Sequence, residues 1–209
     1  LPQKRTFDNH SHILTMNHLE KLDKDTEVGL NIAYYNDNIR REGNSLSDHF
    51  ISDDSRLLMR ESMTSETKVN NLNIQARYNL NSETGFVANV LKFDTNWNSD
   101  RVLGQLSSET TGNTPMSYGN DLVRQHFDRP ELSISNTFNT IKNIGKNSLN
   151  LHFSAGYAHR PNTLNAEIDS MQQNTHTEYT QDVTSHHIAG RFNTGYSIRV
   201  GDYFKFNYG

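Results

Sequence analysis

Histidines are the first residues in this sequence whose type and spacing could do chemistry. His10 and His12 are two residues apart, so in a strand they share one face, which is a spacing that two metal ligands can have. The pair alone does not complete a ligand set, and two solvated polar side chains are the simpler interpretation. His186 and His187 are adjacent, so a strand directs them to opposite faces and they cannot readily chelate one ion together. The histidines therefore predict no metal site.

The carboxylates and the possible nucleophiles also predict no metal site or catalytic site. Asp48, Asp53 and Asp54 form an acidic cluster in a polar segment, and their oxygens are ligands that Ca²⁺ accepts. The segment lacks the glycine and terminal glutamate of a calcium-hand loop, so a solvated acidic loop is preferred over a Ca²⁺ site. No Gly-x-Ser-x-Gly turn, His-Glu-x-x-His helix or phosphate-cradling glycine loop is present. We therefore expect no catalytic residue, no cofactor and no enzyme.

The composition excludes several protein classes. Only 33% of the 209 residues are hydrophobic, and no apolar run approaches the roughly 18 to 20 residues of a membrane-spanning helix. The net charge is -4 and the basic residues are scattered, which argues against a nucleic-acid partner. The absence of cysteine excludes disulfides and a thiol nucleophile, while 10% aromatic residues argue against disorder. An ordered chain without membrane helices remains.

Apolar and polar residues alternate with period two, which predicts strands. The clearest stretch is 148–158, where Leu149, Leu151 and Phe153 alternate with Asn150 and His152. The expected strands are 11–21, 26–35, 69–78, 83–98, 131–141, 148–158, 184–198 and 203–208. In 83–98 the apolar face also carries a polar residue, so a β-bulge is expected there.

The connections between these strands alternate in length. Short polar turns are expected at 23–25, 79–82, 143–147 and 200–202, and long polar segments at 41–56, 99–124 and 162–182. Short turns would then gather at one end and long loops at the other. Antiparallel strands of about ten residues with this asymmetry predict a transmembrane β-barrel, which closes its hydrogen-bond ladder on itself.

The aromatic residues agree with a barrel. Tyr78 and Tyr196 lie beside short turns, whereas Tyr34, Trp97 and Tyr157 lie toward the long segments, as two interfacial girdles require. A soluble antiparallel sandwich has the same alternation and is the competing fold, but its strands are typically shorter. The sequence thus predicts an all-β, antiparallel transmembrane β-barrel segment of about eight strands.

Three stretches carry a family resemblance: Asn-Ile-Gln-Ala-Arg-Tyr-Asn-Leu-Asn at 73–81, Arg-Pro-Glu-Leu-Ser-Ile-Ser-Asn at 129–136 and Asn-Leu-His-Phe-Ser-Ala-Gly-Tyr at 150–157. With them the chain resembles the Asn- and Tyr-rich barrel domain of TonB-dependent outer-membrane receptors of the Bacteroidetes type. The resemblance implies a bacterial outer-membrane location, surrounding lipid, and import of an oligosaccharide, peptide or metal chelate. It also implies a plug domain in the same polypeptide, the TonB energy-transducing system and a surface lipoprotein as partners.

The sequence also departs from that family. It contains no plug-like segment, its last expected strand is short, and it lacks a terminal aromatic residue. We therefore expect residues 1–209 to be part of one barrel domain, an internal segment of a longer polypeptide. A complete eight-stranded barrel is one alternative. A structural or adhesive barrel or sandwich that presents long loops to a partner, without transport, is another. An outer-membrane enzyme is a third, and it would need a convergent Ser/His/Asp or metal constellation.

A barrel assigns a role to each face of the strands. The residues expected to face the lumen are Asn71, Asn73, Gln75, Arg77, Asn150, His152 and Arg191. The residues expected to face lipid are Val28, Leu30, Ile32, Leu72, Ile74, Leu149, Leu151 and Phe153. Ligand contact is expected in the long segment that contains Tyr118, Asn120 and Arg124, because binding residues concentrate on loops held by a rigid frame.

Overall fold

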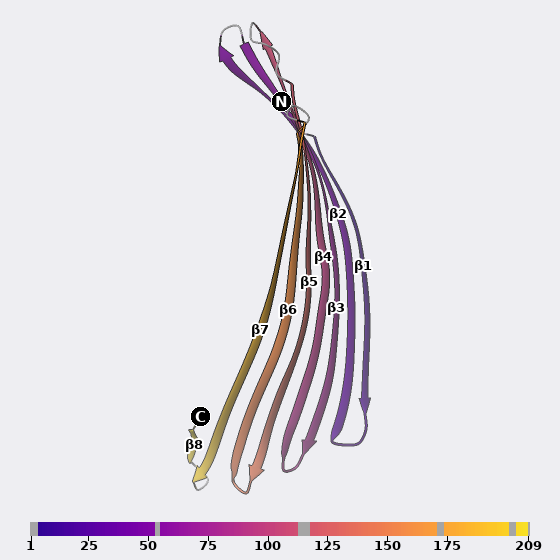
Figure 1. The fold of residues 1–209 in the computed structure, drawn as a ribbon. Coiled ribbons are helices and arrows are strands. Elements are labelled where there is room, and N and C mark those ends of the chain that lie inside the picture. The colour runs from indigo at the N-terminus through magenta and orange to yellow at the C-terminus, as the bar shows by residue number, and fades with distance from the viewer. Residues whose placement is uncertain (1–3, 53–54, 113–117, 171–173, 201–203, 209) are drawn as a thin grey trace.

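The computed structural model describes residues 4–52, 55–112, 118–170, 174–200 and 204–208. Eight strands make up nearly all of it (Figure 1): β1 (Lys4–Lys21), β2 (Thr26–Ser52), β3 (Ser55–Ser82), β4 (Gly85–Gly112), β5 (Tyr118–Ile144), β6 (Asn147–Ser170), β7 (Thr175–Val200) and β8 (Phe204–Tyr208). The described ranges hold no helix that is long and apolar enough to cross a membrane. The expected all-β class is confirmed.

The strands form a single antiparallel sheet. They lie in sequence order from β1 to β8, and each pairs with the next, so the topology is an up-and-down meander. Figure 1 shows one layer of long strands that twist together, as the right-handed twist of strands requires. Among the described residues β1 and β8 are the edges, and β8 covers only the last five residues of β7. The sheet is therefore open, and a second packed layer, as in a sandwich, is not found in the described part.

The expected long loops are wrong. Residues 41–56, 99–124 and 162–182 mostly belong to strands, because the hairpin ladders continue through them. The β2–β3 ladder, for example, runs from Thr26 opposite Leu80 to Phe50 opposite Arg56. These segments are polar on average, but their side chains still alternate between two faces, so they satisfy a strand as well as the apolar stretches do. Polarity alone therefore does not mark a loop in this chain.

The short turns lie close to where they were expected. Asp23 closes the first turn, since its carboxylate accepts hydrogen bonds from the backbone N–H groups of Asp25 (2.8 Å) and Thr26 (2.7 Å). The second turn falls at 83–84, not at 79–82, which still belong to β3. The third falls at 145–146, where Gly145 has a φ of 61° that glycine adopts readily. Of the expected turn at 200–202, residues 201 and 202 lie outside the described residues.

The expected bulge in 83–98 is also wrong. The β4–β5 register is continuous from Gly85 opposite Lys142 to Glu109 opposite Tyr118. The polar residue on the apolar face, Asn89, keeps its place because Asn136 of β5 donates a 2.7 Å hydrogen bond to its side-chain oxygen. A satisfied amide therefore replaces the bulge that the sequence pattern suggested.

The register divides the sheet into two faces, because residues opposite each other point to the same side. The face that carries Ile32, Ile74 and Ile134 is called the first face, and the opposite one the second face. One row on the first face is apolar across seven strands: Met16, Ile32, Ile74, Phe93, Ile134, Tyr157 and Ile188. The half of the sheet that holds this row and the turns at 22–25, 83–84 and 145–146 is called the near half.

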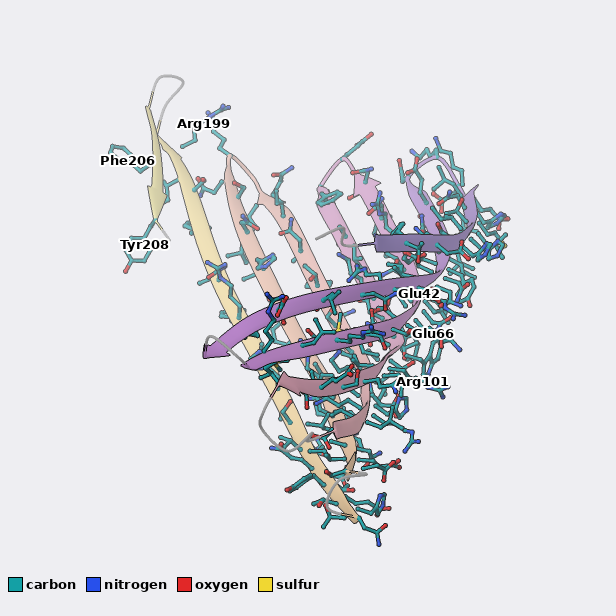
Figure 2. All side chains as sticks on the ribbon, turned by 90° about the horizontal axis from the view of Figure 1, so that it is seen from above. Glu42, Glu66, Arg101, Arg199, Phe206 and Tyr208 are labelled. Carbon is teal, nitrogen blue, oxygen red and sulfur yellow. The ribbon has the colours of Figure 1, made fainter. Side chains whose placement is uncertain are left out.

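The apolar side chains change face in the other half, called the far half. There the second face carries them: Phe7, Ile39, Met63, Val69, Val102, Leu106, Val123, Phe127, Leu164, Ile168, Tyr179 and Val183. The first face is charged instead, with ion pairs such as Arg40–Glu42 (2.7 Å) and Lys68–Glu66 (3.3 Å). Figure 2 shows Glu42, Glu66 and Arg101 along this charged side.

Neither apolar surface is covered. Among the described residues only Ala158 is a buried apolar residue. Ile188 is 81% exposed and Phe192 is 64% exposed on the first face of the near half. Exposed apolar patches can mark contact with a membrane or another protein. Both apolar surfaces are therefore candidates for such contact.

Candidate functional site

A polar band crosses the second face where the near and far halves meet. It consists of Asn71, Asn96, Asn98, Arg129, Glu131, Arg160 and Asn162, contributed by β3 to β6. Most of its members, together with Val69 and Pro130, line a hollow of about 270 Å³. This hollow is lined mainly by polar side chains, and we take the polar band as the candidate site.

The hollow lies where the backbone ladder is interrupted. The β5–β6 ladder stops between Asp128–Thr163 and Leu132–His159, a stretch that contains Pro130. Proline has no N–H to donate, so it cannot contribute to a ladder on that side. The β3–β4 ladder stops at the same height, where Asn70 donates from its backbone N–H to Asn98 Oδ1 (3.3 Å). Side chains therefore replace backbone pairs here, and the polar band borders the gap.

The charges of the band are paired. Arg160 lies with Nη2 2.8 Å from Oε1 of Glu131, and Arg129 contacts Asp100 of β4. Both arginines are about half exposed. They can therefore offer further N–H donors to a ligand while their carboxylate partners neutralise them.

Two acceptor atoms near the band lack partners among the described residues. Asp37 is only 6% exposed; its Oδ2 accepts a 2.8 Å hydrogen bond from the Tyr35 hydroxyl, but its Oδ1 has none. Asn96 Oδ1 is likewise buried and unpaired. Buried acceptors without donors are unfavourable, so these atoms suit a ligand or water that donates hydrogen bonds. The band can thus bind a polar ligand, but it contains no nucleophile with an activating base.

The residues expected to face the lumen share one side of the sheet. Asn71, Asn73, Gln75, Arg77, Asn150, His152 and Arg191 all belong to the second face by register, and Asn71 is part of the polar band. The residues expected to face lipid, Val28, Leu30, Ile32, Leu72, Ile74, Leu149, Leu151 and Phe153, all belong to the first face. The two sets therefore lie on opposite faces of the sheet, and which face meets lipid or a lumen stays a prediction.

The three expected ligand contacts do not join the polar band. Arg124 is on the first face, where its Nη1 lies 2.7 Å from Asp169 and 3.4 Å from Glu167. Tyr118 and Asn120 begin β5 opposite Glu109 and Ser107, and their side chains lie outside the described residues. Arg124 thus sits in an ion-pair network on the opposite face, and its role in ligand contact stays a prediction.

The expected metal ligands form no complete set. His10 and His12 share the first face of β1, and His10 lies 3.5 Å from Asp8. Asp48 is paired with Leu58 inside the ladder, while Asp53 and Asp54 lie outside the described residues. Across the described ranges, no three His, Cys, Asp or Glu side chains are placed to hold a metal ion.

Most of the polar band could not be found from the sequence. Asn71 was identified from its alternation, but Arg129, Glu131 and Arg160 meet only through the β4–β5–β6 register. A weak signal was available in Arg129-Pro130-Glu131, since a proline inside a strand marks an interrupted ladder. Compared with models of known protein families and with curated proteins, the chain matches none.

Proposed function

We propose that this sheet is part of the wall of a transmembrane β-barrel in the bacterial outer membrane. One observation carries the proposal: an uninterrupted apolar row crosses seven strands on the first face, and no core covers it in the described part. Lipid chains would supply the missing apolar surroundings. In the near half the same strands are mostly polar on the second face, which would face an aqueous lumen.

Aromatic residues support this orientation. Tyr78 and Tyr196 bound the apolar belt on the turn side, and Tyr34, Trp97 and Tyr157 bound it toward the far half, all on the first face. In β6 the belt runs from Leu149 to Tyr157, and a tilted strand of about this length spans roughly 25 Å of hydrocarbon. The charged first face of the far half would then project into water.

The unpaired edges of the sheet also support a closed barrel. β1 presents an unpaired edge, and so does β7 before Tyr196 among the described residues. Unpaired backbone groups cost several kcal/mol each in hydrocarbon, so a sheet in lipid has to close. We propose that these two edges join the remaining strands of the barrel.

Transport is the activity that this architecture supports best. The resemblance to TonB-dependent receptors suggests import of an oligosaccharide, peptide or metal chelate, with a plug, the TonB system and a surface lipoprotein as partners. In this proposal the polar band contacts the substrate where the lumen leaves the membrane, because it is the hollow with donors and unpaired acceptors on the lumen side.

The lipid contact can be tested with single cysteines, because the chain contains none of its own. A fluorophore at Ile134→Cys should be quenched strongly by nitroxide-labelled lipids, whereas one at the neighbouring Ser135→Cys should not. The protein would be produced from its whole gene and reconstituted in vesicles. Equal quenching at both positions, or a monomer that needs neither detergent nor lipid, would refute the barrel.

Transport needs a separate test. Cells with and without the gene would be given a labelled oligosaccharide, peptide and ferric chelate, each with TonB present or deleted. Uptake of one class that requires both the gene and TonB supports the receptor. Membrane insertion without any TonB-dependent uptake would favour the structural or adhesive alternative.

A further inference from the structure

We propose that His159 and His186 bind a divalent transition-metal ion, with Tyr157 beside it, on the first face of the sheet. The two histidines lie opposite each other on β6 and β7, and both belong to the first face. Their ring centroids are 4.8 Å apart, and all the contacts between the three side chains are exposed. The site is independent of the polar band, which occupies the other face.

The distances suit a shared ion. His159 Nδ1 lies 3.4 Å from His186 Nδ1. Two imidazole nitrogens bound at about 2.0 to 2.1 Å to one tetrahedral Zn²⁺ are separated by about 3.3 to 3.4 Å. The imidazoles are therefore already spaced as a chelating pair, and the strand ladder places the two residues that carry them opposite each other.

The polar atoms also converge on one point. The Tyr157 hydroxyl lies 2.9 Å from the same Nδ1 of His186 that His159 approaches. A ring nitrogen carries either one lone pair or one proton in the ring plane, so His186 Nδ1 can make only one full hydrogen bond with these two neighbours. A cation between the three atoms could instead use the lone pairs of both Nδ1 atoms, with the Tyr157 oxygen beside it.

Other histidines are less suited to chelation. His176 has each ring nitrogen engaged by a carboxylate, at 2.5 Å from Asp169 and 2.9 Å from Glu178. His187 is next to His186 in sequence but belongs to the second face. Only the pair of His159 and His186 has two imidazoles in contact with each other among the ring contacts of the described residues.

The two imidazole ligands determine which class of metal ion this site would bind. Zn²⁺ and Cu²⁺ favour imidazole ligands, whereas Ca²⁺ and Mg²⁺ require oxygen. Two imidazoles and one phenol leave coordination positions for water, so the ion would be exchangeable, unlike a closed structural zinc. The site lies where the apolar belt of β6 ends toward the far half, and its contacts are exposed.

Calorimetric titration of Zn²⁺ into the detergent-purified protein tests the site, with Cu²⁺ as a second probe read by electron paramagnetic resonance. We expect saturable binding of one Zn²⁺ and nitrogen hyperfine structure from two imidazoles with Cu²⁺. His159→Asn and His186→Asn should each weaken binding by about tenfold or more. Tyr157→Phe should weaken it less, because it removes a neutral phenol and keeps the ring.

His187→Asn is the matched control, since it removes an adjacent imidazole from the opposite face and should leave binding unchanged. Each variant would first be checked for native strand content by circular dichroism. If Zn²⁺ does not saturate, or binds His159→Asn and His186→Asn as tightly as the native protein, the contact is only stacking between strands. Equal weakening by His187→Asn would also overturn the proposal.

Discussion

Asn70 of β3 donates a side-chain hydrogen bond to the carbonyl oxygen of Trp97 on β4, 3.3 Å away, where the backbone ladder between these strands is interrupted. Trp97 is in turn opposite Pro130 of β5. This row separates the half of the sheet that is apolar on the first face from the half that is apolar on the second. The two halves therefore suit two different surroundings, and the change coincides with a local opening of the sheet.

A lysine in the middle of the apolar belt should destabilise the protein in lipid. Phe138 lies opposite Phe153, midway along the belt of β6, so Phe138→Lys places a charge near the centre of the belt, which costs about 2–4 kcal/mol in a transmembrane barrel. Asn139→Lys is the control, because it adds the same charge to the second face. Urea unfolding in lipid vesicles measures the difference. Equal free energies of unfolding for the two variants would contradict the assignment of the faces.

Alternation was sufficient to predict the near half from the sequence. A face such as Leu149, Leu151 and Phe153 is apolar in every second residue, so period two is visible without knowledge of the partners. In the far half the alternation reverses and weakens, as in the stretch from Arg101 to Gln105, where the apolar residues Val102 and Leu103 are adjacent. Long polar segments then resemble loops, because their strand structure depends on pairing with neighbours.

Gly85 should not tolerate a side chain. A Cβ at this position would lie 2.3 Å from the carbonyl oxygen of Ile141, so Gly85→Ala has to displace backbone of β5. We expect a loss of about 1–3 kcal/mol in the free energy of unfolding. Gly104→Ala, on the same strand, is the control, since nothing lies within 4 Å of its Cβ. Urea titration of both variants measures this, and similar midpoints would contradict it.

The pairing of β6 with β7 in the far half should depend on pH. Hydrogen bonds to Glu178 and Asp169 raise the pKa of His176 above its ordinary 6.5. Hydrogen bonds from His176 and then Arg124 lower the pKa of Asp169 below its ordinary 3.8. The stabilisation of this pairing by His176 is complete below pH 6.5 and is lost as pH rises through the raised pKa of His176. The stabilisation by Asp169 is complete above pH 3.8 and is lost as pH falls through the lowered pKa of Asp169.

Protection of the far ends of β6 and β7 should therefore be greatest between about pH 4 and 6.5. Hydrogen exchange of the amides at 165–170 and 174–180, corrected for its intrinsic pH dependence, measures this. His176→Gln should abolish the loss of protection at alkaline pH. The loss of protection at acid pH should remain but become smaller. An unchanged pH profile in the variant would show that the network does not contribute to pairing. Because all these groups are exposed, the effect should be small and reduced by salt.

The candidate sites were harder to predict than the faces. Once the alternation is clear, the sequence tells which face a polar residue is on. Its neighbours on the adjacent strands depend on the register in which the strands pair. His159 and His186 are 27 residues apart in sequence and meet only because β6 and β7 pair in one particular register. A slip by one residue would place His159 opposite His187 or Ser185 instead. Such pairs require the fold before they can be recognised.

Loss of Arg160 should impair uptake more than stability. Its half-exposed pair with Glu131 contributes at most about 1 kcal/mol to folding, so Arg160→Ala should reach the membrane at a near-normal level. If the polar band contacts the substrate, removing a charged donor should reduce the affinity measured by uptake at least about tenfold. Arg124→Ala is the matched control, because Arg124 is also ion-paired and half exposed but belongs to the first face. A reduction in uptake by Arg124→Ala alone would transfer the substrate contact to the segment after Tyr118, where the sequence placed it.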